Sequence, residues 1–156
     1  EIRETIPGVS LTTDLIVGFS GETETQFLHS LNVLEKVRFD KVHSAAYSVR
    51  PGTIASRKLP DDVPIEEKKR RLKAVADLQE AIQAEINSDL EGQEFEILVD
   101  GHTRGDPTGR TRTDKLVFVE EERPVIGDFV TVRVTETSPW SLRGRVSERE
   151  PAEVTN

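Results

Sequence analysis

Hydrophobic residues follow two different periods along this chain, and the change falls near Gly92. Before it, short apolar runs alternate with stripes spaced three and four residues apart, which is typical of strands and amphipathic helices. After it, apolar and polar residues alternate one by one, which is typical of strands with one buried face. The pattern therefore predicts an α/β region followed by an all-β region.

The first region begins with a predicted strand at residues 9–18. A helix follows, because Thr23 and Gln26 have the spacing of a capping box. Its apolar stripe consists of Phe27, Leu31 and Leu34. A second strand is predicted at residues 41–48. A strand, a helix and a strand joined by short connections predict a parallel pair with a right-handed crossover.

A longer helix is predicted from Pro64 to about Leu90. Proline loses no hydrogen bond at the first helical position, and the acidic Glu66 and Glu67 suit a helix N-terminus. The apolar stripe of this helix consists of Leu72, Val75, Leu78, Ile82 and Ile86. Residues 54–63 show no period and are expected to be irregular. The helix would be about 40 Å long and able to connect two domains.

Beyond Gly92, the pattern predicts four short strands that form a small β-barrel. Their apolar faces carry Phe95, Ile97 and Val99, then Leu116 and Phe118, then Val130, Val132 and Val134, and finally Leu142 and Val146. Residues 102–109 have the composition of a loop. We therefore expect an α/β part at 1–63, a connecting helix at 64–91, a barrel at 92–149 and a frayed tail at 150–156.

The composition excludes several kinds of site. The 156 residues include no cysteine, so the chain has no disulfide, no thiolate nucleophile and no cysteine-ligated zinc or iron–sulfur site. His29, His43 and His102 lack metal-ligand spacing, so we expect no metal site. No membrane-spanning run and no signal-peptide pattern occur. Because methionine is absent and residues 1–7 read as the end of a helix, we expect a chain cut from a longer protein.

Cationic side chains concentrate at "TGRTRTDKLVF", residues 108–118, although the formal net charge is −8. Arginine forks match phosphate oxygens, and threonine hydroxyls can donate to phosphate or ribose. The candidate RNA contacts are Arg104, Arg110, Thr111, Arg112, Thr113 and Lys115. The alternative is a solvated hairpin whose charges pair with Asp106, Asp114 and Glu120 to Glu122. The composition does not decide between these two interpretations.

Two further stretches carry candidate chemistry. In "SPWSLRGRV", Trp140 is the only tryptophan and is able to stack on a base, but core packing is favoured because tryptophan is buried on average. Arg143 shares an outward face with Arg145 and would extend the cationic surface. In "TDLIVGFSGET", glycines between a strand and a helix allow backbone to approach a cofactor. Nothing in the spacing of Asp14 and Glu22 supports acid–base catalysis.

Four stretches, "TTDLIVGFSGETE", "YSVRPGTIAS", "GRTRTDKLVF" and "SPWSLRG", together resemble the C-terminal half of the radical-SAM tRNA methylthiotransferases. The resemblance covers residues 1–149 and favours the branch that adds a methylthio group to carbon 2 of N6-isopentenyladenosine beside the anticodon. It implies the end of a radical-SAM partial (βα) barrel followed by a TRAM domain, an OB-like barrel that binds RNA. Ser20 replaces a usual proline, and Asp114 replaces the asparagine usual in this branch.

The resemblance implies a cytoplasmic enzyme that uses S-adenosylmethionine and two [4Fe–4S] clusters. The cluster cysteines would lie in the missing N-terminal part, so this chain would be inactive alone. The implied S-adenosylmethionine-binding residues are Asp14, Ile16, Gly18, Tyr47 and Arg50. The implied partner is the anticodon stem-loop of tRNA, contacted by the cationic residues above together with Trp140 and Arg143. Two alternatives stay open: a stand-alone OB-type RNA-binding module, and a sister enzyme acting on threonylcarbamoyladenosine or a ribosomal protein.

Overall fold

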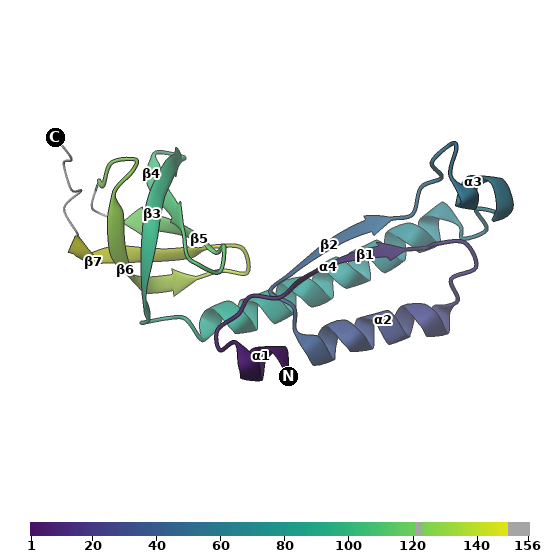
Figure 1. The fold of residues 1–156 in the computed structure, drawn as a ribbon, viewed down its shortest axis with the longest axis horizontal. Helices are drawn as coiled ribbons and strands as arrows, with labels where there is room; N and C mark the ends of the chain where they lie inside the picture. The colour runs from purple at the N-terminus through teal and green to yellow at the C-terminus, as the bar shows by residue number, and fades with distance from the viewer. Residues whose placement is uncertain (121–122, 150–156) are drawn as a thin grey trace. The chain divides into compact units, whose positions relative to one another are not determined.

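A computed structural model describes residues 1–120 and 123–149. The chain divides into two compact units: one spans Leu11–Ile82, and the other combines Glu1–Ser10 with the residues from Gln83 onward. An α/β unit followed by a closed barrel confirms the predicted fold class (Figure 1).

The α/β unit is built on two parallel strands, β1 (Thr12–Val17) and β2 (Lys41–Ala46). Helix α2 (Glu24–Val37) connects them. Its N-terminus is the predicted capping box: the Thr23 hydroxyl accepts from the Gln26 N–H at 3.3 Å, and the Gln26 side chain accepts from the Thr23 N–H at 2.9 Å. The helix ends at Arg38, whose φ of 53° is left-handed. The predicted parallel pair is therefore confirmed.

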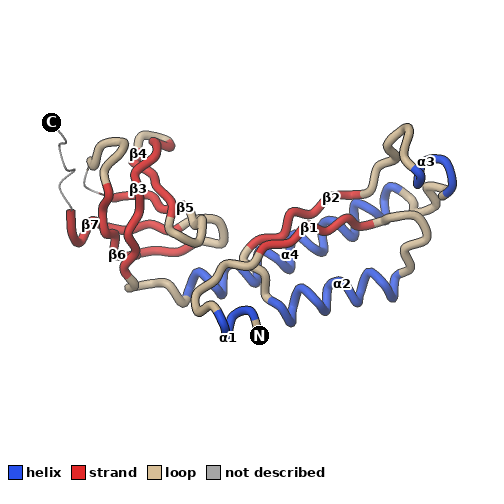
Figure 2. Tube along the Cα trace, in the orientation of Figure 1, coloured by secondary structure: helices blue, strands red, loops and turns tan. Residues whose placement is uncertain are grey.

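One face of this sheet is covered, and the other is open among the described residues (Figure 2). Helix α4 (Ile65–Ser88) and helix α2 pack on the covered face. The buried core there consists of Val17, Phe27, Leu34 and Val75. Asp14 and Ile16 lie on the opposite face, where they are exposed. Parallel sheets are normally covered on both faces, so the open face is the unusual feature of this unit.

Two short helices lie outside this arrangement. Helix α3 (Ile54–Lys58) shows that the expectation of an irregular 54–63 segment is wrong for its first half. The Thr53 hydroxyl caps it by accepting from the Ser56 N–H at 3.1 Å, a local bond that a search for apolar periodicity does not detect. Helix α1 (Ile2–Thr5) lies within the predicted helix end at residues 1–7.

The second unit contains a five-stranded closed barrel in the order β3-β4-β5-β7-β6. Its strands are β3 (Glu94–Thr103), β4 (Asp106–Arg110), β5 (Leu116–Glu120), β6 (Phe129–Thr137) and β7 (Leu142–Arg149). Neighbouring strands are antiparallel except β5 and β7, which are parallel. The core consists of Ile97, Val99, Val117, Val119, Val130, Val132, Val134 and Leu142.

Two details of the predicted barrel are wrong. The 102–109 segment is not simply a loop, because β4 begins within it at Asp106. On β5 the buried side chains are Val117 and Val119 rather than Leu116 and Phe118. All four positions are apolar, so alternation alone could not say which pair faces the core. The inward faces predicted for the other strands are confirmed by buried Ile97, Val99, Val130, Val132, Val134 and Leu142.

Among the described helices, none combines the length and the hydropathy needed to cross a membrane.

Candidate nucleic-acid interface and cofactor pocket

The cationic loop between β4 and β5 is a tight turn held by its own hydrogen bonds. The Thr111 N–H donates to the Lys115 carbonyl at 3.1 Å, and the Lys115 N–H donates to the Thr111 hydroxyl at 3.1 Å. The Thr111 and Thr113 hydroxyls are 3.0 Å apart. Asp114 has a φ of 63°, a conformation that aspartate and asparagine tolerate better than most residues. The turn is therefore closed by bonds within the loop itself, and Asp114 suits its backbone as asparagine would.

The cations of the loop differ in how far they are already engaged. Arg110 donates to the carbonyl and the carboxylate of Asp114 at 3.0 and 3.1 Å. The Lys115 ammonium donates to Oδ1 of Asn87 at 2.8 Å. Among the described residues, Arg112 makes only a long contact to Glu96, at 3.4 Å, and its side chain is 90% exposed. Arg112 is therefore the more accessible of the two guanidinium groups of the loop for an outside phosphate.

Trp140 lies on the turn between β6 and β7 and is 61% exposed. The expectation favoured above, that it plugs the core, is wrong. The turn is closed by Ser138, whose N–H donates to the Ser141 carbonyl at 2.9 Å and whose hydroxyl accepts from the Ser141 N–H at 3.0 Å. An exposed indole on an ordered turn has the geometry needed to stack on an unpaired base.

The outward face of β7 carries arginines that already have acidic neighbours. The Arg143 guanidinium lies 5.1 Å from the centre of the Phe118 ring and 3.7 Å from the Asp106 carboxylate. Arg145 lies 3.9 Å from Glu120. These exposed pairs are long and individually weak. The pair of Arg110 with Asp114 is a contact of the kind that the solvated-hairpin alternative expects, whereas Glu121 and Glu122 lie outside the described residues. Arg104 is exposed in the turn that precedes β4.

A cavity of about 320 Å³ lies where β1 and β2 end. Its lining consists of Ile16, Ala45, Ala46, Tyr47, Ser48, Arg50, Thr53 and Ala55. The structure thus brings together three of the five residues predicted to bind a cofactor, namely Ile16, Tyr47 and Arg50. Asp14 lies one pleat earlier on the same open face, and Gly18 lies beneath the Lys68 side chain. A Cβ at Gly18 would collide with that side chain, so the glycine is required there.

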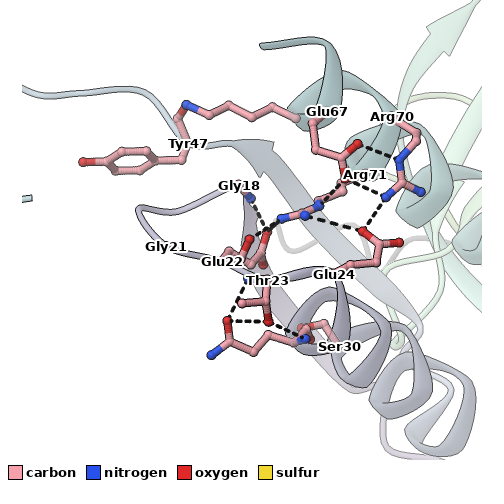
Figure 3. Close-up of polar contacts among 12 residues, drawn as sticks. Gly18, Gly21, Glu22, Thr23, Glu24, Ser30, Tyr47, Glu67, Arg70 and Arg71 are labelled. Atoms are coloured by element: carbon pink, nitrogen blue, oxygen red, sulfur yellow. Dashed lines mark hydrogen bonds and ion pairs between the residues drawn. The ribbon is translucent and has the colours of Figure 1, made fainter. Parts of the chain in front are cut away.

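A cluster of charged side chains joins the β1–α2 loop to helix α4 (Figure 3). Arg71 donates to Glu22 at 2.6 Å and to Glu67 at 2.8 Å, although its side chain is only 5% exposed. Glu22 also accepts the Gly18 N–H at 2.6 Å. Oε2 of Glu22 thus accepts from the loop backbone and from Arg71, so Glu22 connects the loop to α4.

The electrostatics of the cluster follow from these bonds. The pKa of Glu67 is lowered to about 2, mainly because Glu67 accepts a hydrogen bond from Arg70. The same hydrogen bond is the main reason that the pKa of Arg70 is raised. Burial lowers the pKa of Arg71, but the hydrogen bonds to Glu22 and Glu67 outweigh that effect and raise it. All three groups therefore stay charged throughout the neutral range.

Lys68 is the second buried cation of α4 and was missed by the sequence analysis. Its ammonium donates to the Tyr47 carbonyl at 3.2 Å, pairs with Asp61 and lies 5.3 Å from the centre of the Tyr47 ring. The signal was present, because counting the stripe of α4 backward from Val75 at helical spacing gives Arg71 and Lys68. The sequence analysis considered the apolar stripe and the acidic first turn of this helix, and not its cations.

The comparisons with known proteins agree with this geometry. Residues 89–147 match the TRAM domain family. Enzymes named tRNA-2-methylthio-N(6)-dimethylallyladenosine synthase are similar over nearly the whole chain. The one from Dehalococcoides mccartyi is 45% identical over 93% of this chain and 35% of its own length. Those from Bacillus cytotoxicus and Herpetosiphon aurantiacus are 45% and 48% identical over 99% and 93% of this chain, and over 30% and 34% of their own lengths.

The chain therefore spans about a third of the length of the curated relatives it matches. The match is continuous across the α/β unit and the barrel, so it does not depend on the TRAM domain alone. The predicted resemblance is confirmed: the chain carries a TRAM domain and is similar over nearly its whole length to the tRNA methylthiotransferases named above.

Proposed function

We propose that the chain is the RNA-holding portion of an enzyme that methylthiolates carbon 2 of N6-isopentenyladenosine beside the anticodon of tRNA. The observation that carries this proposal is the identity of 45–48% over at least 93% of the chain to synthases named for that product. The proposed enzyme works in the cytoplasm, where its tRNA substrate is made. The remaining catalytic parts belong to the N-terminal portion of the same protein, so this chain is inactive alone.

The barrel supplies the proposed grip on the anticodon stem-loop. Arg112 offers an accessible fork for a phosphate, and Arg110 adds positive charge in the same loop, while Arg104 lies in the turn at the other end of β4. Exposed Trp140 offers a platform for an unpaired base. Because the net charge of the chain is −8, attraction to RNA depends on this local surface and should weaken as salt rises.

The α/β unit supplies part of the proposed S-adenosylmethionine pocket. When bound, this cofactor supplies the methyl group and, after reductive cleavage, a radical. The residues around the cavity fit part of such a ligand, because Ile16 and Ala45 give it an apolar wall and Arg50 gives it a cation for a carboxylate. Lys68 holds the end of β2 through the Tyr47 carbonyl, which keeps that wall in place. In this proposal Asp14 and Gly18 contribute from the sheet face and the strand end.

The two [4Fe–4S] clusters do not fit this chain. Clusters of this kind are held by thiolates, and the sequence contains no cysteine. The described residues also contain no group of three histidine, aspartate or glutamate side chains able to hold a metal. We therefore assign no cluster chemistry to these residues, and the proposed cluster ligands belong to the remainder of the enzyme.

The test is binding of a fluorescent anticodon stem-loop, measured by anisotropy at several salt concentrations. Arg112→Ala should weaken binding and reduce the slope of log affinity against log salt by about one, because one phosphate contact is lost. The control is Arg133→Ala, which removes an exposed arginine paired with Glu94 elsewhere on the barrel and should change little. Equal binding of the stem-loop and of a DNA hairpin of the same length by the unaltered chain would contradict the proposal.

A further inference from the structure

Asn87, near the end of α4, has a buried amide group whose hydrogen-bonding positions are all used. Its Oδ1 accepts from the Gln83 side chain at 3.0 Å and from the Lys115 ammonium at 2.8 Å. Its Nδ2 donates to the carbonyls of Ser138 and Pro139 at 2.7 and 3.2 Å. An amide has two acceptor sites and two donor hydrogens, so its orientation is fixed. The residue is only 2% exposed, which keeps water from competing for these bonds.

These bonds join two segments that are distant in the sequence. One end of the amide holds Lys115, the last residue of the cationic loop. The other end holds Ser138 and Pro139, which precede Trp140 directly. The ammonium of the loop residue Lys115 and the backbone of the turn at Ser138 and Pro139 are therefore held by the same planar group.

Both segments are already ordered within themselves, so the amide fixes one rigid element against another. The loop is closed by the backbone and hydroxyl bonds of Thr111. The turn is closed by Ser138, whose hydroxyl also accepts the Trp140 N–H at 3.4 Å. A buried amide that bridges two exposed, ligand-accessible turns has a role that an apolar side chain of similar volume could not replace.

We propose that Asn87 is a positioning residue for RNA, which sets the spacing between the cationic loop and Trp140. With that spacing, a single RNA strand is able to place a phosphate on Arg112 while one of its unpaired bases stacks on Trp140. Preorganisation of this kind raises affinity because the ordering of the two turns is not required on binding. This inference rests on the proposed function and adds to it a residue that need not touch the RNA.

The experiment compares Asn87→Ala with Gln79→Ala. Gln79 is a matched control, since it is a buried amide on the same helix that donates to a backbone carbonyl, that of Phe39, at 3.0 Å within the α/β unit. Asn87→Ala should weaken stem-loop binding about tenfold, the scale of losing one base stack. It should also shift the emission of Trp140, the only tryptophan. Gln79→Ala should leave both quantities unchanged.

A double-mutant cycle separates positioning from general damage to the fold. If Asn87 acts through the Trp140 turn, Asn87→Ala should cost much less affinity in a Trp140→Leu background than in the unaltered chain. Fully additive losses, or unchanged binding by Asn87→Ala, would overturn the inference. If Asn87→Ala does not fold, Asn87→Ser takes its place, and unfolding of both would overturn the inference by making Asn87 a folding residue.

Failure of this inference is distinguishable from failure of the proposed function. If the unaltered chain binds the stem-loop and binding responds to Arg112→Ala but not to Asn87→Ala, only the positioning role of Asn87 is contradicted. If the unaltered chain does not bind the stem-loop, both the positioning role and the proposed function are contradicted.

Discussion

The barrel and the α/β unit differ in whether the edges of their strands are hydrogen-bonded. Every strand of the barrel is hydrogen-bonded to two neighbours, so its ladder is closed. In the α/β unit, β1 and β2 bond only to each other within the described residues. The barrel thus completes its backbone bonding by itself, whereas the α/β unit depends on helix packing and charged contacts. We expect weaker hydrogen-exchange protection in residues 1–60 than in the barrel.

The interiors of the two units also differ, in how far each depends on charged side chains. The barrel core is wholly aliphatic and mostly valine. The α/β unit has a smaller fully buried core, beside which the buried cations Arg71 and Lys68 are held by acidic partners. Trp140 lies in the barrel unit and Tyr47 in the α/β unit, and each is the only residue of its type. Trp140 emission, excited where tyrosine does not absorb, and the tyrosine component of the second-derivative absorbance therefore report on the two units separately.

The largest effect is expected from Gly144→Ala in the barrel. A Cβ there would collide with the Arg133 carbonyl and with the Val132 side chain on the neighbouring strand. Overpacking against backbone should lower the free energy of unfolding by about 3 kcal/mol. Urea unfolding followed by Trp140 emission should show the loss, while the Tyr47 signal stays near its original midpoint.

The control for this substitution is Gly101→Ala. The nearest atom to a Cβ at that position is the Thr108 hydroxyl at 3.6 Å, which is an ordinary contact. It should unfold close to the unaltered chain. A similar loss in both variants, or a shift of both probes together, would show that the two units do not differ as described.

The sequence predicted features that depend on local bonds and missed those that depend on neighbours. The capping box at Thr23 was predictable because both partners lie within four residues. Strand β4 was not, because "DPTGR" combines proline and glycine and resembles a turn. It becomes a strand because β3 and β5 pair with it, and Gly109 allows the close approach, since a Cβ there would collide with the Leu98 carbonyl.

The candidate sites divide in the same way. Ile16, Tyr47 and Arg50 were grouped by family resemblance, and the cavity at the strand ends brings them together. The exposure of Trp140 was mispredicted, because average burial says nothing about a turn closed by Ser138. The role of Asn87 was invisible, because its partners lie at least 28 residues away in sequence, apart from Gln83.

A smaller effect, confined to the α/β unit, is expected from Arg71→Met. The substitution removes the buried arginine that binds Glu22. Of the bonds to the Glu22 carboxylate described above, only the one from the Gly18 N–H is then left. Removing one member of a buried pair should cost about 3 kcal/mol or somewhat less here, because Glu22 keeps some solvent contact. Tyr47 absorbance should report the loss, while Trp140 emission stays unchanged.

Arg70→Met is the matched control, because Arg70 binds Glu67 and Glu24 from an exposed position. Solvent screens exposed pairs and they contribute little to stability, so this variant should remain close to the unaltered chain. Equal losses in the two variants would contradict the view that the connection between the loop and α4 depends on the buried arginine.

The smallest expected effect is a change in how stability depends on acid. The folded-state pKa of Glu67, about 2, lies below its ordinary value of 4.5, mainly because of the hydrogen bond from Arg70. A lowered folded pKa means that the unfolded chain binds the proton more tightly, so the contribution is fully present above pH 4.5 and is lost as the pH falls toward 2. Glu67→Gln should therefore give a shallower loss of α/β-unit stability across that window, measured by urea midpoints from Tyr47 absorbance.

Arg70→Met should also reduce the slope of stability against pH although the carboxylate is retained, because the main cause of the lowered pKa is gone. Identical slopes in all three chains would mean that the charged cluster does not stabilise the α/β unit through Glu67, and the contrast with the uncharged barrel core would then depend on Arg71 and Lys68 alone.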